Sequence, residues 1–224
     1  MVIVLIIFTG LLIYSYFIEP NYIEITHHQI KLSPFPEKYD KFKIVHLTDI
    51  HGQKFIQGKK HLVQLVNREN PDMIVITGDL IFRVGDFDYV LEMINKMKAE
   101  YGIYFCPGNH EYKMGLASVK KKLEAAGIRF LRNEAEIIAG KIIQNKAGTE
   151  EKKDPLFKLI GVDDYELGLP FSLPRLRGEE RKLPSLLISH SPDVGEEAGR
   201  AGIDLVLAGH THGGQIRLPL LGAL

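Results

Sequence analysis

Disulfide bonds are the first feature that the sequence lacks, because Cys106 is the single cysteine among 224 residues. One thiol excludes an internal disulfide framework and leaves the redox compartment open. The chain also lacks net charge, since 28 lysines and arginines balance 28 aspartates and glutamates. A neutral chain gives no electrostatic argument for nucleic-acid capture, so we expect no nucleic-acid partner and only local affinity for anions.

Internal repeats and low-complexity tracts are also missing, and the length suits one large domain with an appendage. We expect an anchor at residues 1–20, a linker with a first hairpin at residues 21–42, and the main domain at residues 43–224.

The first segment, Val2 to Ile18, is apolar or weakly polar throughout. As a helix it would span roughly 25 Å, close to the hydrocarbon thickness of a bilayer, with Tyr14, Tyr16 and Tyr22 near the interface. We therefore expect a single-pass transmembrane helix. A cleaved signal peptide and a buried helix are the alternatives, although the segment lacks a basic n-region and a small-x-small cleavage site. Diffuse lysines after the segment favour a cytoplasmic main domain.

From Tyr22 onward, short β-branched runs alternate with helical stretches, which is typical of an α/β fold. In the first half we expect strands at Lys43 to Leu47, Met73 to Thr77 and Gly102 to Cys106, and helices at Lys59 to Arg68, Asp86 to Lys98 and Ala117 to Ala126. In the second half we expect a second sheet that contains the strands Glu136 to Ile143 and Phe157 to Val162. Further strands are expected at Leu186 to Ser189 and Ile203 to Ala208, with Gln215 to Leu218 as the start of one more. Leu169 to Leu183 predicts an irregular loop.

Seven nitrogen and oxygen donors follow the ends of these strands: Asp49, His51, Asp79, Asn109, His190, His210 and His212. Strand ends in α/β sheets converge on one rim, where such proteins bind ligands. Any one of these histidines alone would more often be a surface or core residue, but together they predict a metal site. Two aspartates with imidazoles suit manganese, iron, cobalt or zinc rather than calcium. One ion needs fewer donors, so we expect two divalent ions that share the Asp79 carboxylate.

Five motifs occur in a fixed order along the chain: Asp49-Ile50-His51, Gly78-Asp79, Gly108-Asn109-His110-Glu111, His190, and Gly209-His210-Thr211-His212. In these motifs the sequence resembles the calcineurin-like metallophosphoesterases. His190-Ser191-Pro192-Asp193 and Gly213-Gly214-Gln215 are similar to the membrane-associated bacterial branch, the UDP-2,3-diacylglucosamine hydrolase-like phosphoesterases. The resemblance implies a four-layer α/β/β/α sandwich of two mixed sheets with the helices outside.

The resemblance also implies a role for each matching residue. One ion would bind Asp49, His51, Asp79 and His212, and the second would bind Asp79, Asn109, His190 and His210. His110 would contact the phosphate and protonate the leaving oxygen, and Glu111 would orient His110. The reaction would be hydrolysis of a phosphodiester or pyrophosphate bond in a phosphorylated small molecule or lipid.

Two departures from the family pattern stand out. The usual pattern continues with further strands, whereas this chain stops at Leu224, so we expect an incomplete second sheet or a fragment. Phe82 stands where the related purple acid phosphatases place a metal-bound tyrosine, which argues against iron(III) chemistry. Two other residues have structural interpretations, because His46 would face away from Asp49 in an extended strand and Cys106 ends an apolar strand.

The leading hypothesis is a lipid-linked substrate such as UDP-2,3-diacylglucosamine, because an anchor would hold the pocket near a membrane surface. A general phosphatase or phosphodiesterase for soluble substrates is the alternative. A catalytically silent metal-binding scaffold would require damaged ligands, and every expected donor is present.

Overall fold

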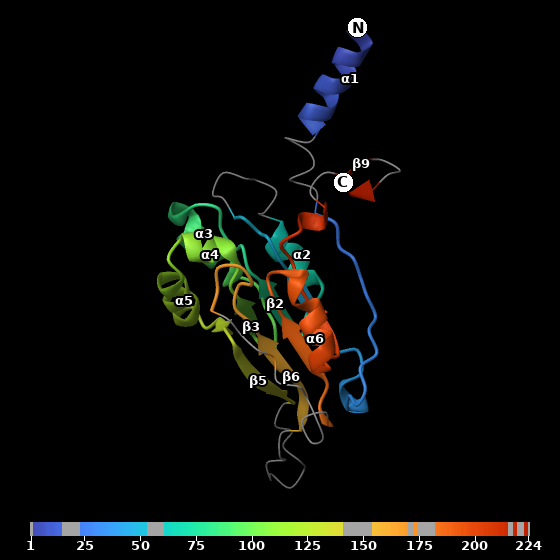
Figure 1. Cartoon of the computed structure of the whole chain (residues 1–224), viewed down its shortest axis with the longest axis vertical. Helices are drawn as coiled ribbons and strands as arrows, with labels where there is room; N and C mark the ends of the chain where they lie inside the picture. The colour runs from blue at the N-terminus through green and yellow to red at the C-terminus, as the bar shows by residue number, and fades with distance from the viewer. Residues whose placement is uncertain are drawn as a thin grey trace.

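Two four-stranded sheets form the centre of the computed structural model (Figure 1), which describes residues 2–14, 23–52, 61–140, 154–169, 173, 182–214, 217–218 and 222–223. The first sheet is parallel and has the order β1 (Ile44–Leu47), β2 (Met73–Thr77), β3 (Ile103–Cys106), β4 (Arg129–Phe130). The second has the order β5 (Glu134–Ala139), β6 (Pro155–Gly161), β7 (Ser185–Ile188), β8 (Leu205–Leu207), with only the β5–β6 pair antiparallel.

The described helices are short. The α-helices of the sandwich are α2 (Leu62–Arg68), α3 (Phe87–Ile94), α4 (Asn109–Lys113), α5 (Leu116–Ala125) and α6 (Gly195–Ala201). The 3₁₀ helices are η3 (Glu37–Tyr39), η5 (Val84–Asp86), η7 (Pro192–Val194) and η8 (His212–Gly214). Near the C-terminus, β9 (Arg217–Leu218) and β10 (Gly222–Ala223) form an antiparallel pair.

Apolar side chains point alternately to the two faces of the central strands, so the sheets pack between two helical layers. In β2, Ile74 and Ile76 belong to the core that also contains buried side chains of α2, α3 and α5. Met73 and Val75 belong to a second core, shared with Leu186 and other residues of the second sheet. Successive side chains of a strand point to opposite faces, so β2 is buried on both sides.

The outer face of the second sheet is covered by α6. Leu187 of β7 packs in a third core with Val194 and with Ala198 of α6. The order of layers is therefore helices, first sheet, second sheet, helix, which confirms the predicted four-layer α/β/β/α sandwich. The prediction that both sheets are mixed holds only for the second, since the described strands of the first are all parallel.

Most predicted strands are present with shifts at their ends, and the helices differ more. Of the predicted strand Gln215 to Leu218, only residues 217–218 are described, as β9, which pairs with β10. The predicted strand Glu136 to Ile143 is β5, and residues 141–143 lie outside the described residues. The predicted helix Asp86 to Lys98 begins at Phe87 and ends at Ile94, after which the chain tightens into i→i+3 bonds such as Met97 N to Ile94 O at 2.8 Å. The described part of the predicted helix Lys59 to Arg68 begins at Leu62, and residues 53–60 lie outside the described residues.

Two helices were not predicted. Helix α4 begins at Asn109, where the sequence indicated only a turn. Helix α6 contains two glycines within seven residues, which lowers intrinsic helix propensity, and it forms because Ala198 and Ala201 are buried. The hairpin expected within residues 21–42 is not seen in residues 23–42, where the one regular element is η3. Most of the predicted loop Leu169 to Leu183 lies outside the described residues.

The N-terminal apolar segment contains α1 (Val2–Ile13), twelve residues long, which projects away from the sandwich (Figure 1). Its described large apolar side chains are exposed, from 52% at Ile13 to 73% at Ile3. Among the described residues, none of the helices is both long and apolar enough to cross a membrane. The predicted transmembrane helix continues into residues 15–20, which are outside the described part of the chain.

Candidate metal centre

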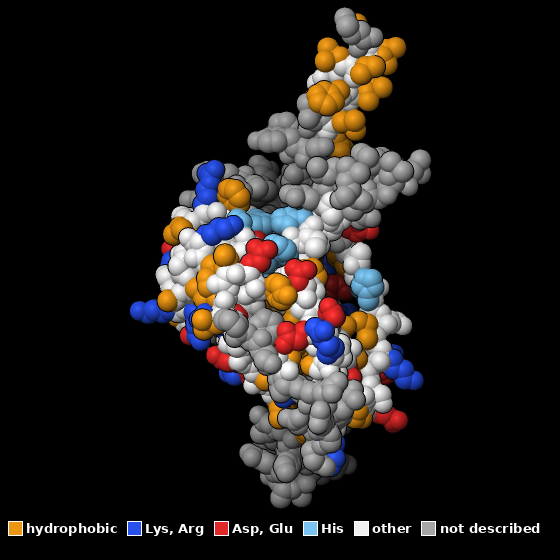
Figure 2. Space-filling view, in the orientation of Figure 1, with side chains coloured by type: hydrophobic (Ala, Val, Ile, Leu, Met, Phe, Trp, Pro, Cys, Tyr) orange, Lys and Arg blue, Asp and Glu red, His pale blue; other side chains and the backbone are white. Residues whose placement is uncertain are grey.

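The residues expected to bind metal follow strands that end at the same edge of the sandwich. Two follow β1, one follows each of β2, β3 and β7, and two follow β8: Asp49 and His51, then Asp79, Asn109 and His190, then His210 and His212. Figure 2 shows histidine side chains, in pale blue, gathered in a patch at the upper end of the globular part of the molecule, below the projecting N-terminal helix. The structure thus brings together side chains that are up to 163 positions apart in the sequence, from Asp49 to His212.

Unusual backbone conformations mark this edge. Positive φ angles between 43° and 71° occur at five of the seven expected ligands: Asp49, His51, Asp79, His210 and His212. The left-handed conformation costs a non-glycine residue roughly 1–2 kcal/mol and is concentrated at functional sites. Glycines are needed where the turns lie closest to one another. A Cβ at Gly108 would lie 2.6 Å from Asp79 Oδ1, and a Cβ at Gly209 would overlap Thr48 Oγ1.

The first group of donors consists of Asp49, His51 and His212, whose ligand atoms all lie within 4.8 Å of one another. His212 Nε2 is 3.3 Å from His51 Nε2 and 3.3 Å from Asp49 Oδ1. Nitrogen ligands lie about 2.0–2.1 Å from zinc, so two ligands of one ion are roughly 3.0–3.4 Å apart. The spacing of these three atoms therefore fits one divalent ion.

The second group surrounds His190, which is fully buried. Its Nε2 lies 3.0 Å from His210 Nδ1, 3.2 Å from Asn109 Oδ1 and 3.6 Å from Asp79 Oδ2. His190 Nδ1 is 2.9 Å from the carbonyl oxygen of Thr77 and donates to it. That hydrogen bond fixes the tautomer and leaves the Nε2 lone pair free to bind a metal ion.

Asp79 lies between the two groups. Its Oδ2 is 3.6 Å from His51 Nε2 on one side and 3.6 Å from His190 Nε2 on the other. His110 Nε2 is 3.9 Å from the same oxygen, so His110 also reaches this centre. The other oxygen of Asp79, Oδ1, accepts the backbone N–H of His110 at 2.9 Å and is thereby held away from the cluster.

Asp49 shows the same division between its two oxygens. Its Oδ2 accepts hydrogen bonds from Thr48 Oγ1 at 2.7 Å and from the backbone N–H of His210 at 2.9 Å. Its Oδ1 is buried and has no hydrogen-bond partner. Among the described residues, the ion pairs of Asp49 and Asp79 involve only histidines. A buried carboxylate oxygen that accepts no hydrogen bond is costly, so this arrangement fits a bound cation.

The Asn109 amide gives a second sign of a cation site. Its oxygen lies 3.2 Å from His190 Nε2 and 3.3 Å from Asp79 Oδ2, so three acceptors face one another. A cation between them would satisfy all three atoms. Without a cation the amide gains hydrogen bonds by turning over, since its oxygen would then accept from Lys113 Nζ at 2.9 Å. The donor set therefore fits divalent metal ions of the kind expected from the sequence.

The pKa values of two histidines fit their roles at the site, one as an expected metal ligand and the other as a supporting residue. Burial lowers the pKa of His51 to about 4, which keeps its ring neutral and its lone pair available. Burial also lowers the pKa of His46 to about 4, and its Nε2 lies 2.8 Å from Thr77 Oγ1. His46 thus contacts the residue whose carbonyl orients His190, which is a structural role.

Glu111 binds backbone groups of two turns, whereas the resemblance implied that it orients His110. Its buried carboxylate accepts three backbone N–H groups, from Asp79 at 2.9 Å, Leu80 at 2.9 Å and Gly108 at 2.8 Å. It therefore joins the turn that carries Asp79 to the turn that begins α4, and these contacts do not orient the His110 ring. Burial raises its pKa to about 7, although these hydrogen bonds act in the opposite direction.

A second polar network was missed from the sequence. Asp163, which is fully buried after β6, accepts hydrogen bonds from Tyr112 Oη at 2.6 Å and Arg132 Nε at 2.7 Å. Arg132 Nη2 also donates to Tyr112 Oη at 3.0 Å. Tyr112 belongs to α4, so this network ties the helix of Asn109 and His110 to the second sheet. No sequence motif connects these residues, and only the fold brings them together.

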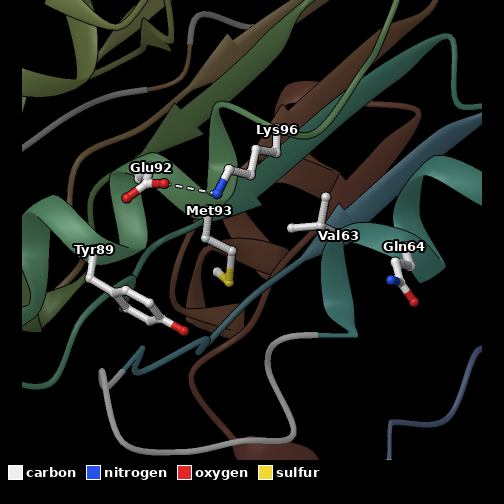
Figure 3. A pocket seen from close by; sticks show the side chains of 6 residues that line it. All are labelled: Val63, Gln64, Tyr89, Glu92, Met93 and Lys96. Atoms are coloured by element: carbon white, nitrogen blue, oxygen red, sulfur yellow. Dashed lines mark hydrogen bonds and ion pairs between the residues drawn. The ribbon is translucent and has the colours of Figure 1, made fainter.

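A cavity of about 280 Å³ lies elsewhere, between α2 and α3 (Figure 3). Its lining is Val63, Gln64, Tyr89, Glu92, Met93 and Lys96. The two charged residues pair with each other, with Lys96 Nζ 2.8 Å from Glu92 Oε1. None of the expected metal ligands lines this cavity, so the chemistry lies at the strand ends.

Comparison with known protein families matches residues 42–214 to the description calcineurin-like phosphoesterase. The chain belongs to the calcineurin-like phosphoesterases. This membership confirms the resemblance seen in the sequence at the level of the family, but not its UDP-2,3-diacylglucosamine hydrolase-like branch, and identifies the chain as a metal-dependent hydrolase of phosphate esters. The Asp and His groups of the centre are in keeping with the divalent metals that calcineurin-like phosphoesterases use.

Relatives of this calcineurin-like phosphoesterase come from several organisms. Metallophosphoesterase YkuE of Bacillus subtilis is 31% identical, over 94% of this chain and 72% of the relative. Phosphodiesterase YaeI of Escherichia coli is 30% identical, over 93% of this chain and 74% of the relative. A Danio rerio protein named transmembrane protein with metallophosphoesterase domain is 32% identical, over 84% of this chain and 44% of its own length.

A solved structure, the calcineurin-like phosphoesterase YfkN of Bacillus subtilis, matches with a TM-score of 0.47 and 16% identity. The match covers 76% of this chain and 72% of that one.

Proposed function

We propose that this phosphoesterase binds two divalent ions, with Asp79 as the shared ligand, and hydrolyses a phosphodiester or pyrophosphate bond. The observation that carries the proposal is the position of Asp79 Oδ2, 3.6 Å from a histidine nitrogen of each donor group. One ion would be held by Asp49, His51, Asp79 and His212, and the other by Asp79, Asn109, His190 and His210. Nitrogen and oxygen donors without thiolate suit manganese, iron, cobalt or zinc.

The residues around the donors have separable roles. When bound, paired divalent ions acidify a water molecule and stabilise charge on the phosphoryl oxygens. His110 belongs to neither proposed ligand set, yet its Nε2 lies 3.9 Å from Asp79 Oδ2. It is thus placed beside the reacting phosphate, where it can donate a proton to the leaving oxygen. Asp79 Oδ1 holds the backbone of His110 in that position.

A lipid-linked substrate, such as UDP-2,3-diacylglucosamine, is the finer part of the proposal. Its support is the apolar, exposed helix α1, which projects from the end of the molecule where the histidines gather (Figures 1 and 2). We propose that residues 1–20 anchor the domain of residues 43–224 in a membrane in a single pass, after a linker at residues 21–42. The lysines that follow the segment favour a cytoplasmic domain.

Metal analysis of the full-length protein tests the two-ion proposal. After removal of metal and reconstitution with manganese or zinc, we expect close to two ions per chain by mass spectrometry. A consistent single ion would contradict the shared role of Asp79.

Turnover of paired substrates tests the substrate class. A lipid nucleotide diphosphate and a lipid-free phosphodiester would be compared with the same metal-loaded enzyme in detergent micelles. A clear preference for the lipid substrate supports the proposal. Comparable kcat/KM values would instead indicate a general phosphodiesterase for soluble substrates, and no metal-dependent turnover of either would contradict the enzymatic role.

Membrane attachment can be tested with Leu5→Lys combined with Leu11→Lys. Each lysine at bilayer depth costs about 2.5–3.5 kcal/mol on insertion scales, so we expect release from membranes in carbonate extraction. Ile30→Lys, at an exposed position beyond the segment, is the matched control. If the double variant stays in the membrane, the segment is not the anchor. A cleaved signal is tested separately, by mass spectrometry of the mature protein, which would then lack residues 1–18.

A further inference from the structure

A large aromatic side chain stands at the edge of the metal centre without being buried there. Phe82 is 50% exposed, although the strand and turn that precede it are buried from Met73 to Ile81. An aromatic ring gains most of its stabilisation from burial, so a half-exposed ring contributes less to the fold than it could. Its open half is therefore available to another molecule.

The position of Phe82 is fixed by the backbone. Ile81 forms a parallel bridge with Gly52, and the N–H groups of His51 and Gly52 donate to the carbonyls of Asp79 and Leu80, both at 2.9 Å. The segment that carries Phe82 is thus paired with the segment that carries His51. The backbone at Phe82 therefore cannot move away from the centre without disturbing a proposed metal ligand.

Two imidazoles support one side of the ring. The Phe82 centroid lies 6.3 Å from that of His51, with an interplanar angle of 74°, and 5.8 Å from that of His110, with an angle of 34°. The two imidazoles contact each other as well, with centroids 4.6 Å apart. Phe82 therefore continues a wall of rings that begins inside the centre and ends at its exposed edge.

We propose that Phe82 is a specificity-determining residue that forms an apolar wall for the leaving group, so that the enzyme favours phosphoesters whose leaving group is aromatic or otherwise apolar. The inference rests on the proposed function, because His110 donates its proton to the leaving oxygen. The leaving group must then pass beside His110, and Phe82 is the exposed apolar ring that contacts His110. An apolar leaving group covers the open half of that ring and removes it from water.

A kinetic comparison isolates the leaving group. 2-Phenylethyl methylphosphonate and ethyl methylphosphonate each have one cleavable ester, and their alkoxide leaving groups are of similar basicity. In the metal-loaded wild type we expect a higher kcat/KM for the phenylethyl ester. Phe82→Ala should lower this preference by about 3- to 10-fold, which is the range of one aromatic contact, and Phe82→Leu should keep part of it.

The control is Val84→Ala, two residues further on and 67% exposed, which should leave the ratio of the two kcat/KM values unchanged. A purely structural role of Phe82 would reduce both esters equally. An unchanged ratio in Phe82→Ala would overturn the proposal, even if overall activity falls.

A binding measurement separates this inference from the proposed activity. Calorimetry on metal-loaded protein would compare 2-phenylethylphosphonate with ethylphosphonate, neither of which can be hydrolysed. Tighter binding of the phenylethyl compound that is lost in Phe82→Ala supports the wall even if no ester is turned over, in which case only the enzymatic role fails. Equal affinities in the wild type would overturn the wall, whatever the turnover.

Discussion

Glu111 and Asp163 are both fully buried carboxylates beside strand ends, one in each half of the sandwich, and the protein holds them by different means. Glu111 accepts only backbone N–H groups in its hydrogen bonds. Asp163 accepts backbone N–H groups too, but also the Arg132 guanidinium and the Tyr112 hydroxyl. Burial raises the pKa of Glu111 to about 7, whereas the hydrogen bonds of Asp163 outweigh burial and keep its pKa below the usual value.

The difference follows from what each half must bind. Asp163 has a cationic side chain of the protein beside it, so its network is complete. Glu111 accepts hydrogen bonds from backbone N–H groups. In the described ion pairs, the nearby carboxylates of Asp49 and Asp79 have only histidines as partners. The proposed metal ions would supply positive charge beside these two carboxylates. Helix α4 connects the two halves, because Glu111 faces the first sheet and the next residue, Tyr112, reaches Asp163.

The largest effect is expected from Asp79→Asn, which removes one negative charge from the proposed metal centre. Both proposed ions lose a ligand, so activity should fall by several orders of magnitude and the metal content should fall with it. Mass spectrometry of bound metal and steady-state kinetics measure the two losses. Asp88→Asn, at a largely exposed position paired with Lys122, is the control. Near-normal turnover with full metal content would contradict the shared role of Asp79.

His110→Asn should affect chemistry without affecting metal content. General acid catalysis is worth about 100- to 10,000-fold, so hydrolysis of an alkyl phosphodiester should fall by that amount. A nitrophenyl ester needs little protonation of its leaving group, and its rate should fall much less. Equal losses for both esters would indicate that His110 stabilises charge on the phosphoryl oxygens. Loss of a metal ion would mean that His110 is a ligand.

The sequence predicted the fold and the seven clustered donors because both depend on local patterns. Buried β-branched runs predict parallel strands, and polar residues directly after them must meet at one edge. The order of motifs then selects the family. His46 and Cys106 have the structural roles that were predicted for them, since the first contacts Thr77 and the second is fully buried.

The sequence could not predict contacts that depend on tertiary packing. Glu111 contacts Asp79, 32 positions away, through backbone groups that have no sequence signature. The contact of Tyr112 with Asp163, 51 positions away, crosses between the two halves of the sandwich. Helix α6 has weak intrinsic propensity and forms on the face of the second sheet. The positive φ angles of the ligands likewise follow from the converging turns.

Asp163→Asn tests whether the second network is structural. The change leaves the Arg132 guanidinium with a neutral partner and the Tyr112 hydroxyl with a weaker acceptor, so we expect a loss of about 3–4 kcal/mol in the free energy of unfolding. Urea denaturation measures this loss. Metal content and kcat of the folded fraction should change little. If kcat falls while stability is kept, the network instead positions α4 for catalysis.

The smallest expected effect concerns the pH dependence that Glu111 gives to the metal-free protein. Its pKa is raised from 4.5 to about 7 on folding, so the folded state binds the proton more tightly than the unfolded state. The stabilisation is therefore fully present below about pH 4.5 and is lost as the pH rises to about 7. Between about pH 5 and 7.5 this should amount to roughly 2–3 kcal/mol.

Glu111→Gln removes the titrating group. As the pH rises over this range, the free energy of unfolding of the variant should therefore fall less than that of the wild type. Urea titrations without metal measure both. Other titrating groups are common to both proteins and cancel in the difference. Glu92→Gln, at an exposed position, should follow the wild type. Added zinc should reduce the difference, because nearby cations favour the ionised carboxylate. Parallel curves for wild type and Glu111→Gln would show that the three N–H donors outweigh burial, and that Glu111 is ionised in the folded protein throughout this range.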